Sequence, residues 1–174
     1  MDRFDTTGAG AIRRVLSVLC AARRVAVFAH EHPDGDALGS SLALAGFLRA
    51  AGHEAVAVRH GALPDSIRFL DAPGAPLVEA GGFALREGDA VCLVDCHEAS
   101  RVPAPLRRYV GPAPLAVVDH HVAADYPTEA VYAVPDASST AELVWNIARE
   151  AGWPLSHDIA EALWTGIVTD TGRF

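Results

Sequence analysis

Three short runs of apolar residues constrain the fold of this chain more than any other feature. They lie at residues 25–29 (VAVFA), 89–95 (DAVCLVD) and 115–119 (LAVVD). Short runs that are apolar throughout, instead of alternating with polar residues, are typical of strands buried on both faces of a sheet. Segments with helical spacing separate the runs, and strands that alternate with helices predict a mainly parallel sheet with helices on both faces. We therefore expect a doubly wound α/β fold.

The helices that we expect follow from periodicity and from residues that start or stop helices. Apolar residues recur with helical spacing over residues 12–24 and 37–51, and Gly52 is placed to end the second of these helices. Ser139 begins an S-x-x-E capping box that predicts a helix ending before Gly152, and Ser156 is a candidate cap for a last helix. Further predicted elements are short helices at residues 65–70 and 103–109 and strands at residues 54–58 and 130–134, with loop over the rest of residues 63–79.

Size and charge limit the classes of partner. The chain has 174 residues, the size of one domain, and a formal charge of −8. An acidic surface disfavours long duplex DNA, so a phosphate-ester substrate would need bound cations to supply positive charge. No apolar run reaches the roughly 18 residues of a membrane span, and residues 1–10 are too polar for a signal peptide. We expect a cytoplasmic protein with no membrane partner.

Acidic and histidine residues follow each apolar run where the strand should end. The candidates are His30, Asp34 and Asp36 after the first run, Asp95 after the second, and Asp119, His120 and His121 after the third. In a parallel sheet the carboxyl ends of the strands share one edge, where ligands bind, and Asp170 near the end of the last helix is placed to join them. Crowded carboxylates repel unless cations lie between them. A mixture of carboxylates and imidazoles suits Mn²⁺, with Mg²⁺ or Co²⁺ as alternatives, and two such ions support phosphoryl chemistry.

Each cluster taken alone also has a purely structural interpretation. Residues 33–35 are turn formers, Asp95 could cap the next element, and residues 138–140 could simply begin a helix, although helix N-termini also bind phosphate. His32 and His97 lie beside the predicted site, and a supporting role for them stays open. The joint placement of all the clusters favours the functional interpretation. The chain has no G-x-x-x-x-G-K-[ST] loop and no G-x-S-x-G elbow.

These motifs resemble those of the DHH phosphoesterases. Residues 30–40 (HEHPDGDALGS) resemble the first family motif, Val94-Asp95 the second, Asp119-His120-His121 the third and residues 169–174 (TDTGRF) the fourth; residues 137–144 resemble the stretch between the last two. The motifs occur in order over nearly the whole chain. The resemblance implies that residues 1–174 are the N-terminal catalytic domain of such an enzyme.

The resemblance also implies roles for individual residues. One manganese ion would be held by His30, Asp34 and Asp95, and a second by Asp36, Asp95, His120 and Asp170, with Asp95 bridging. Asp119 would orient its neighbours, and His121 would contact the scissile phosphate and assist as a proton donor. Further substrate contacts would come from Ser138, Ser139 and Arg101, the last at the position of an arginine often found after the second motif.

Within the family, the serine-rich helix start is most similar to the bifunctional oligoribonucleases that also hydrolyse 3′-phosphoadenosine 5′-phosphate. The expected substrate is therefore a short oligonucleotide or a nucleotide. A cyclic-dinucleotide phosphodiesterase and a truncated, non-catalytic metal- or nucleotide-binding module stay open as alternatives, as does a homodimer. Family members usually carry a second, substrate-holding domain called DHHA1, and nothing in this sequence resembles it, so we expect a fragment or a truncated form.

Overall fold

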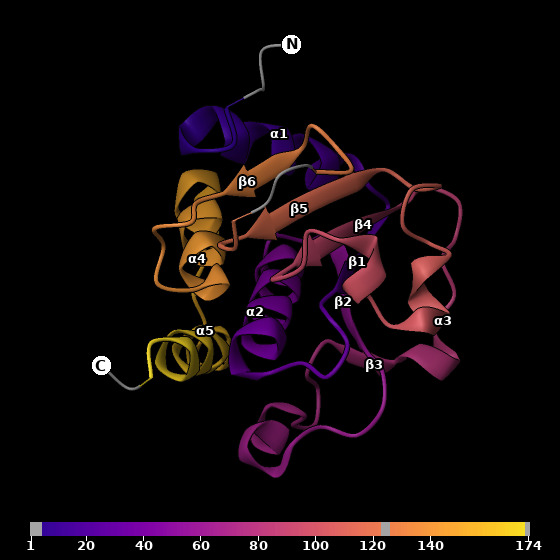
Figure 1. Cartoon of the computed structure of the whole chain (residues 1–174), viewed down its shortest axis with the longest axis vertical. Coiled ribbons are helices and arrows are strands. Elements are labelled where there is room, and N and C mark those ends of the chain that lie inside the picture. Colours follow the sequence, from indigo (N-terminus) through magenta and orange to yellow (C-terminus); the bar gives the residue numbers. More distant parts are fainter. Residues whose placement is uncertain (1–4, 123–125, 173–174) are drawn as a thin grey trace.

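A single parallel sheet organises the chain in the computed structural model, which describes residues 5–122 and 126–172 (Figure 1). Its strands are β1 (Arg24–Phe28), β2 (Glu54–Arg59), β3 (Leu77–Glu79), β4 (Asp89–Val94), β5 (Leu115–Asp119) and β6 (Val131–Ala133). They lie in the order β3-β2-β1-β4-β5-β6, and every neighbouring pair is parallel. The predicted α/β fold with a mainly parallel sheet is confirmed.

The order of the strands reverses between β1 and β4. From this point the chain builds outward through β2 and β3 on one side and through β5 and β6 on the other. The register places Phe28 opposite Leu93, and Val94 opposite Val118, so β1, β4 and β5 end at the same edge. A crevice opens at such a reversal because the two flanking connections leave on opposite faces of the sheet, and ligands bind there.

The two faces of the sheet are covered unequally. One face carries the long helices α1 (Gly8–Ala21), α2 (Gly35–Ala50) and α4 (Thr140–Ala151), while α5 (His157–Asp170) packs mainly against α2. The other face is covered by the short helix α3 (Ala104–Arg107), by 3-10 turns at Ala80–Gly82 and Ala99–Arg101, and by loops. The longest helix in the described part of the chain is α2, with 16 residues, and none there has the length and apolarity to cross a membrane.

Capping residues set the helix boundaries largely as predicted. The Ser139 hydroxyl group accepts a hydrogen bond from the Glu142 N–H at the start of α4, and Gly152 ends that helix with a left-handed φ of 68°. Ser156 caps α5 in the same way. Helix α1 ends at Ala21, before the predicted end at residue 24, because Arg24 already belongs to β1.

Two predicted segments differ from the structure. Residues expected as loop form β3, a three-residue strand that pairs with β2 and is too short to leave a period in the sequence. Helix α3 is shorter than the predicted helix at residues 103–109, whereas the short helix predicted at residues 65–70 is present as a 3-10 helix over Asp65–Leu70. Neither segment contributes a residue to the groups of ligand-type atoms found among the described residues, so the predicted ligands are unaffected.

Candidate metal centre

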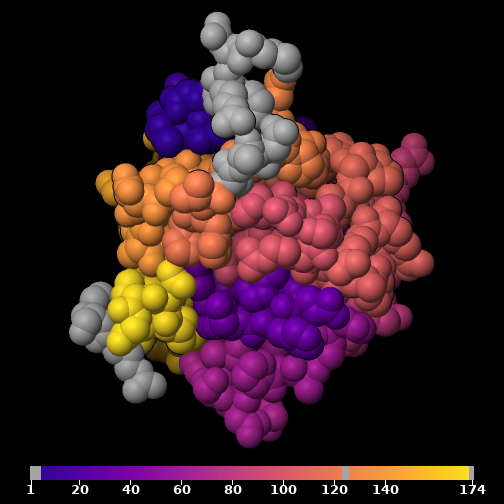
Figure 2. Space-filling view, in the orientation of Figure 1, coloured from indigo at the N-terminus to yellow at the C-terminus, as the bar shows by residue number. Residues whose placement is uncertain are grey.

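The carboxyl edge of β1, β4 and β5 gathers the predicted site residues. His30 follows β1, Asp95 follows β4, Asp119 ends β5 and is followed by His120 and His121, α2 brings Asp34 and Asp36 at its start, and α5 brings Asp170 at its end. The space-filling view shows segments from distant parts of the sequence, coloured violet, rose, orange and yellow, side by side on one face (Figure 2). Arg173 and Phe174 of the fourth motif lie outside the described residues.

Asp95 occupies the centre of this edge in an uncommon backbone conformation. Its φ of 54° lies in the left-handed region, which disfavours residues with a Cβ atom. Only 2% of the residue is exposed. Non-glycine residues held in this region cost about 1 kcal/mol or more and cluster at functional sites, so the fold around Asp95 must enforce it.

The first group of ligand-type atoms consists of His30, Asp34 and Asp95, which lie within 4.8 Å of one another. His30 Nε2 is 3.4 Å from Asp95 Oδ2 and 4.0 Å from Asp34 Oδ1. His30 Nδ1 lies 2.9 Å from the Glu31 carbonyl oxygen, which can only accept, so Nδ1 carries the proton and Nε2 points at the carboxylates. The hydrogen bond with Asp95 raises the pKa of His30, although burial opposes the shift.

The second group consists of Asp36, His120 and Asp170. His120 Nε2 is 3.5 Å from Asp170 Oδ2, 3.7 Å from Asp95 Oδ1 and 3.9 Å from Asp36 Oδ2. This nitrogen is buried and has no hydrogen-bond partner among the described residues. A buried polar atom without a partner is costly, and here it faces three carboxylates, so the donor set fits a cation lying between them.

Asp36 is held rigidly although it is a buried acid. Its two carboxylate oxygens accept hydrogen bonds from the Thr140 and Ala141 N–H groups, at 2.7 and 3.0 Å, in the first turn of α4. A Cβ atom on Gly166 of α5 would come within 2.8 Å of Asp36 Oδ1, so glycine is required for this close approach. Burial, followed by repulsion from Asp95, raises the pKa of Asp36 to about 7, although the α4 hydrogen bonds oppose the shift. Burial also raises the pKa of Asp170, partly opposed by His120.

Asp119 lies beneath the two histidines that follow it. It is fully buried, and Asp119 Oδ1 accepts hydrogen bonds from His121 Nδ1 at 2.8 Å and from the His121 N–H at 3.1 Å. The side chain of His121 is 44% exposed and is therefore accessible to a substrate. A third group of ligand-type atoms joins Asp95, His120 and His121. The structure thus brings together every predicted ligand and both residues assigned to orientation and phosphate contact.

Two further residues at this edge contact the site aspartates. The Thr140 hydroxyl group donates to Asp95 Oδ1 at 3.1 Å, and His97 Nδ1 lies 2.6 Å from Asp119 Oδ2. The sequence leaves a supporting role for His97 open, and it places Thr140 in a helix start without indicating a contact with Asp95. The S-x-x-E motif placed Thr140 at a helix N-terminus but carried no signal for its partner on β4.

The residues predicted to contact substrate, Ser138, Ser139 and Arg101, differ in how accessible they are. Ser139 is fully buried and its hydroxyl group caps α4, while Ser138 is exposed and its N–H donates to Glu142 Oε2 at 2.8 Å. The N–H groups of the first turn of α4 bind Asp36 and Ser139, so they do not offer the phosphate site considered from the sequence. Arg101 lies in the turn after β4, half-buried. Substrate contacts by Ser138, Ser139 and Arg101 stay predictions.

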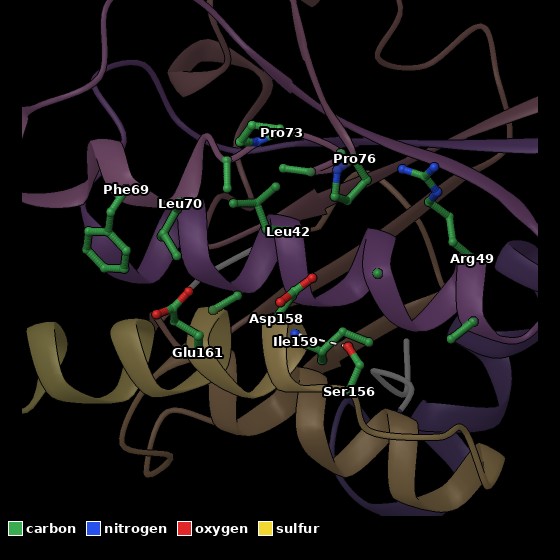
Figure 3. A pocket seen from close by; sticks show the side chains of 16 residues that line it. Leu42, Arg49, Phe69, Leu70, Pro73, Pro76, Ser156, Asp158, Ile159 and Glu161 are labelled. Atoms are coloured by element: carbon green, nitrogen blue, oxygen red, sulfur yellow. Dashed lines mark hydrogen bonds between the residues drawn. The ribbon is translucent and has the colours of Figure 1, made fainter.

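A cavity of about 360 Å³ lies away from these groups, between α2, the loop at residues 69–76 and the first turns of α5 (Figure 3). Its lining includes the apolar side chains of Leu42 and Ile159 and the charged side chains of Arg49, Asp158 and Glu161. None of the predicted site residues lines this cavity. This cavity is therefore separate from the groups of ligand-type atoms at the sheet edge.

Comparisons with known proteins agree with this geometry. Residues 24–167 match the family model described as DHH family, N-terminal domain. A bifunctional oligoribonuclease and PAP phosphatase of Bacillus subtilis is 30% identical over 153 residues, which is 83% of this chain and 45% of that protein. A probable manganese-dependent inorganic pyrophosphatase of Streptococcus mutans is 32% identical over 152 residues, 85% of this chain and 48% of that protein.

A solved structure extends the likeness to the whole fold. The exopolyphosphatase-related protein from Bacteroides fragilis superposes with a TM-score of 0.84 at 26% identity, over 96% of this chain and 52% of that one. The chain spans about half the length of the curated relatives it matches. The similarity therefore concerns one half of those proteins, the half that corresponds to the sheet and its carboxyl edge.

Proposed function

The chain belongs to the DHH family of phosphoesterases, and we propose that it hydrolyses phosphate esters of short oligonucleotides or of 3′-phosphoadenosine 5′-phosphate with the help of two Mn²⁺ ions. The observation that carries this proposal is the buried His120 Nε2, which lacks a hydrogen-bond partner and faces carboxylates on three different elements. The Bacillus subtilis relative is named for both activities, and the Streptococcus mutans relative is named as manganese-dependent.

In this proposal residues 1–174 act as a catalytic domain with two adjoining sets of ligands. His30, Asp34 and Asp95 form one set, and Asp36, Asp95, His120 and Asp170 form the other, so Asp95 belongs to both. When bound, the ions supply Lewis-acid activation of the phosphate and a nucleophile at neutral pH. Asp95 needs a fixed orientation to serve two sets, and Thr140 donates the hydrogen bond that supports it.

His121 has a different part in the proposed reaction. Its Nδ1–H group donates to Asp119, so Nε2 on the exposed side of the ring is the atom that can reach a substrate. A protonated His121 would donate from Nε2 to a phosphate oxygen and then to the leaving oxygen as the ester bond breaks. Asp119 holds the orientation of the ring through the hydrogen bond to Nδ1 while Nε2 transfers this proton.

The charge of the chain supports a small substrate. A formal charge of −8 disfavours long nucleic acids, whereas a short anion can be held entirely within the neutralised site. The name of the Streptococcus mutans relative makes inorganic pyrophosphate a second candidate substrate. A substrate panel containing short RNA, 3′-phosphoadenosine 5′-phosphate, pyrophosphate and cyclic di-AMP separates these classes by relative kcat/KM.

The direct test measures both turnover and metal binding. We expect Mn²⁺-dependent release of mononucleotides from RNA of two to five nucleotides, and loss of both turnover and Mn²⁺ binding in Asp95→Ala. His157→Ala, on an exposed residue at the start of α5, is the control and should match the wild type. Full turnover in the presence of a chelator would contradict the proposal, and so would unchanged metal affinity in Asp95→Ala. Metal binding without turnover on any of these substrates would favour a binding module instead.

A further inference from the structure

His97 is buried beside the candidate metal centre but belongs to none of the groups of ligand-type atoms found among the described residues. It lies in the turn after β4, two positions beyond Asp95, and its side chain is 10% exposed. One edge of its ring meets Asp119, and the ring of Tyr126 packs against it at a centroid distance of 6.1 Å and an interplanar angle of 74°. Among the described residues Asp119 is its one hydrogen-bond partner, and Glu98 Oε1 lies 3.7 Å from Nε2, so the ring has a defined orientation.

The carboxylate of Asp119 is divided between two histidines. Asp119 Oδ2 lies 2.6 Å from His97 Nδ1, and Asp119 Oδ1 lies 2.8 Å from His121 Nδ1. A carboxylate only accepts hydrogen bonds, so both rings carry a proton on Nδ1. The three side chains therefore form a continuous row, with His97 at the buried end and His121 at the exposed end.

His97 supplies the only side-chain donor found for Asp119 Oδ2 among the described residues. A fully buried carboxylate oxygen without a donor is strongly unfavourable. Without His97 the carboxylate would rotate about its Cβ–Cγ bond to share the remaining donors on His121. That rotation would move Oδ1 away from His121 Nδ1, because the two oxygens are fixed to one planar group.

We propose that His97 is a positioning residue for the phosphoester hydrolysis proposed above: through Asp119 it fixes the orientation and the Nδ1–H tautomer of His121, which contacts the substrate. His97 does not itself touch substrate or metal. The arrangement is an inner support of the kind that orients catalytic and metal-binding histidines in other proteins, where its removal typically costs about 10- to 100-fold in activity. The expected loss of kcat rests on the proposed function, whereas the expected change in the orientation and tautomer of His121 does not.

The test compares two substitutions at one position. His97→Leu removes the donor, whereas His97→Asn keeps an N–H group near the position of Nδ1. We expect His97→Leu to lower kcat by about 10- to 100-fold with KM and Mn²⁺ affinity within about threefold of wild type, and His97→Asn to recover most of the loss. Leu106→Ala is the control for general destabilisation. Leu106 lies in the apolar cluster that also contains Cys96, and its substitution should leave kcat unchanged.

A second measurement does not depend on activity. Two-bond ¹H–¹⁵N correlation spectra of the metal-free protein should show His121 as the Nδ1–H tautomer in wild type and in His97→Asn, and a mixture of tautomers in His97→Leu. Unchanged His121 resonances in His97→Leu would overturn the inference, as would equal losses of kcat in both variants. Absence of turnover in the wild-type protein would instead remove the proposed function, while the spectra would still decide whether His97 positions His121.

Discussion

Strand β4 has a buried aspartate at each end, and the two are treated differently by the fold. Asp89 begins the strand and is paired with the guanidinium group of Arg24, which also donates to the Ala84 carbonyl oxygen at 2.8 Å. Asp95 follows the last residue of the strand, and its neighbours are histidines, a threonine hydroxyl group and other carboxylates. Both aspartates are 2% exposed.

The difference separates a structural acid from a ligand-type acid. At the amino end of the sheet the chain supplies its own cation, so the buried charge is already compensated. At the carboxyl end, Asp36 and Asp170 add negative charge beside Asp95, and no Arg or Lys forms an ion pair with them among the described residues. In the proposed function an external cation would supply the positive charge at the carboxyl end, whereas Arg24 supplies it at the amino end.

The largest effect is expected from Arg24→Met. It leaves Asp89 buried without its partner, and breaking a buried pair in this way costs about 3–5 kcal/mol of unfolding free energy. Urea unfolding in the presence of a chelator measures this loss, with Arg24→Lys as an intermediate control. Mn²⁺ affinity should stay within about twofold of wild type, since Asp89 takes no part in the metal centre. A parallel loss of metal affinity would break the comparison between the two ends.

Asp95→Asn should show the opposite behaviour. Because Asp95 belongs to both proposed ligand sets, we expect Mn²⁺ affinity to fall by at least about 100-fold, equivalent to about 2.7 kcal/mol. Stability without metal should not decrease, because the substitution relieves repulsion from Asp36. Calorimetric titration and unfolding of the same sample measure the two quantities. A variant that lost stability but kept its metal affinity would show that Asp95 is a second structural acid.

The pH dependence of metal binding should give a smaller effect. Asp36 has a pKa of about 7 in the metal-free fold and must lose its proton to bind metal, so affinity should rise about tenfold between pH 6 and pH 8. Titrations in buffers with different ionisation enthalpies should reveal the released proton. A pH-independent affinity, with no proton released, would contradict the raised pKa of Asp36.

The raised pKa of Asp36 also predicts how the unfolding free energy of the metal-free protein depends on pH. The pKa of Asp36 is raised from 3.8 in the unfolded chain to about 7 in the folded state. The protonated side chain therefore contributes fully to the unfolding free energy below about pH 4, and this contribution is lost as pH rises through 7. The raised pKa of His30 acts in the same direction above pH 6.5. Asp170→Asn removes one repulsive neighbour of Asp36. Between pH 5 and pH 8 the unfolding free energy of this variant should therefore fall less than that of the wild-type protein. An equal fall in both proteins would exclude this coupling.

The smallest effect is expected from Thr140→Val. It removes the hydroxyl group that donates to Asp95 while keeping the shape of the side chain, at a cost of about 1 kcal/mol in stability or metal affinity. Thr140→Ser retains the hydroxyl group and should behave like wild type in both measurements. Equal losses in Thr140→Val and Thr140→Ser would mean that the methyl group, and not the hydrogen bond, matters.

The contrast between the ends of β4 also explains what could be predicted from the sequence. Parallel strands share a carboxyl edge, so the residues that follow three apolar runs could be expected to meet there, and Asp36, Asp95 and His120 do meet. The pairing of Arg24 with Asp89 depends on the register of β1 and β4, in which the two residues lie opposite each other. Nothing local in the sequence specifies that register, so Asp89 appeared only as part of a strand.

The hydrogen bonds that hold the site residues could not be predicted from the sequence for a similar reason. The hydrogen bonds from α4 to Asp36 join residues more than 100 positions apart, and they arise from the packing of α4 beside α2. The S-x-x-E motif predicted where α4 begins but not that its first turn holds a site carboxylate. Strand β3 escaped prediction because three residues are too few to show a period. Local signals therefore placed the elements, and packing between distant elements placed the supporting contacts.

Mn²⁺ titration followed by electron paramagnetic resonance tests most directly whether acidic and imidazole groups at the carboxyl edge share a pair of ions. We predict two Mn²⁺ per wild-type chain with a spin-coupled signal, because both ligand sets include Asp95. In Asp95→Asn the coupled signal should disappear. A wild-type chain that binds no Mn²⁺, or binds two ions whose signals are uncoupled, would contradict a shared centre at this edge of the sheet.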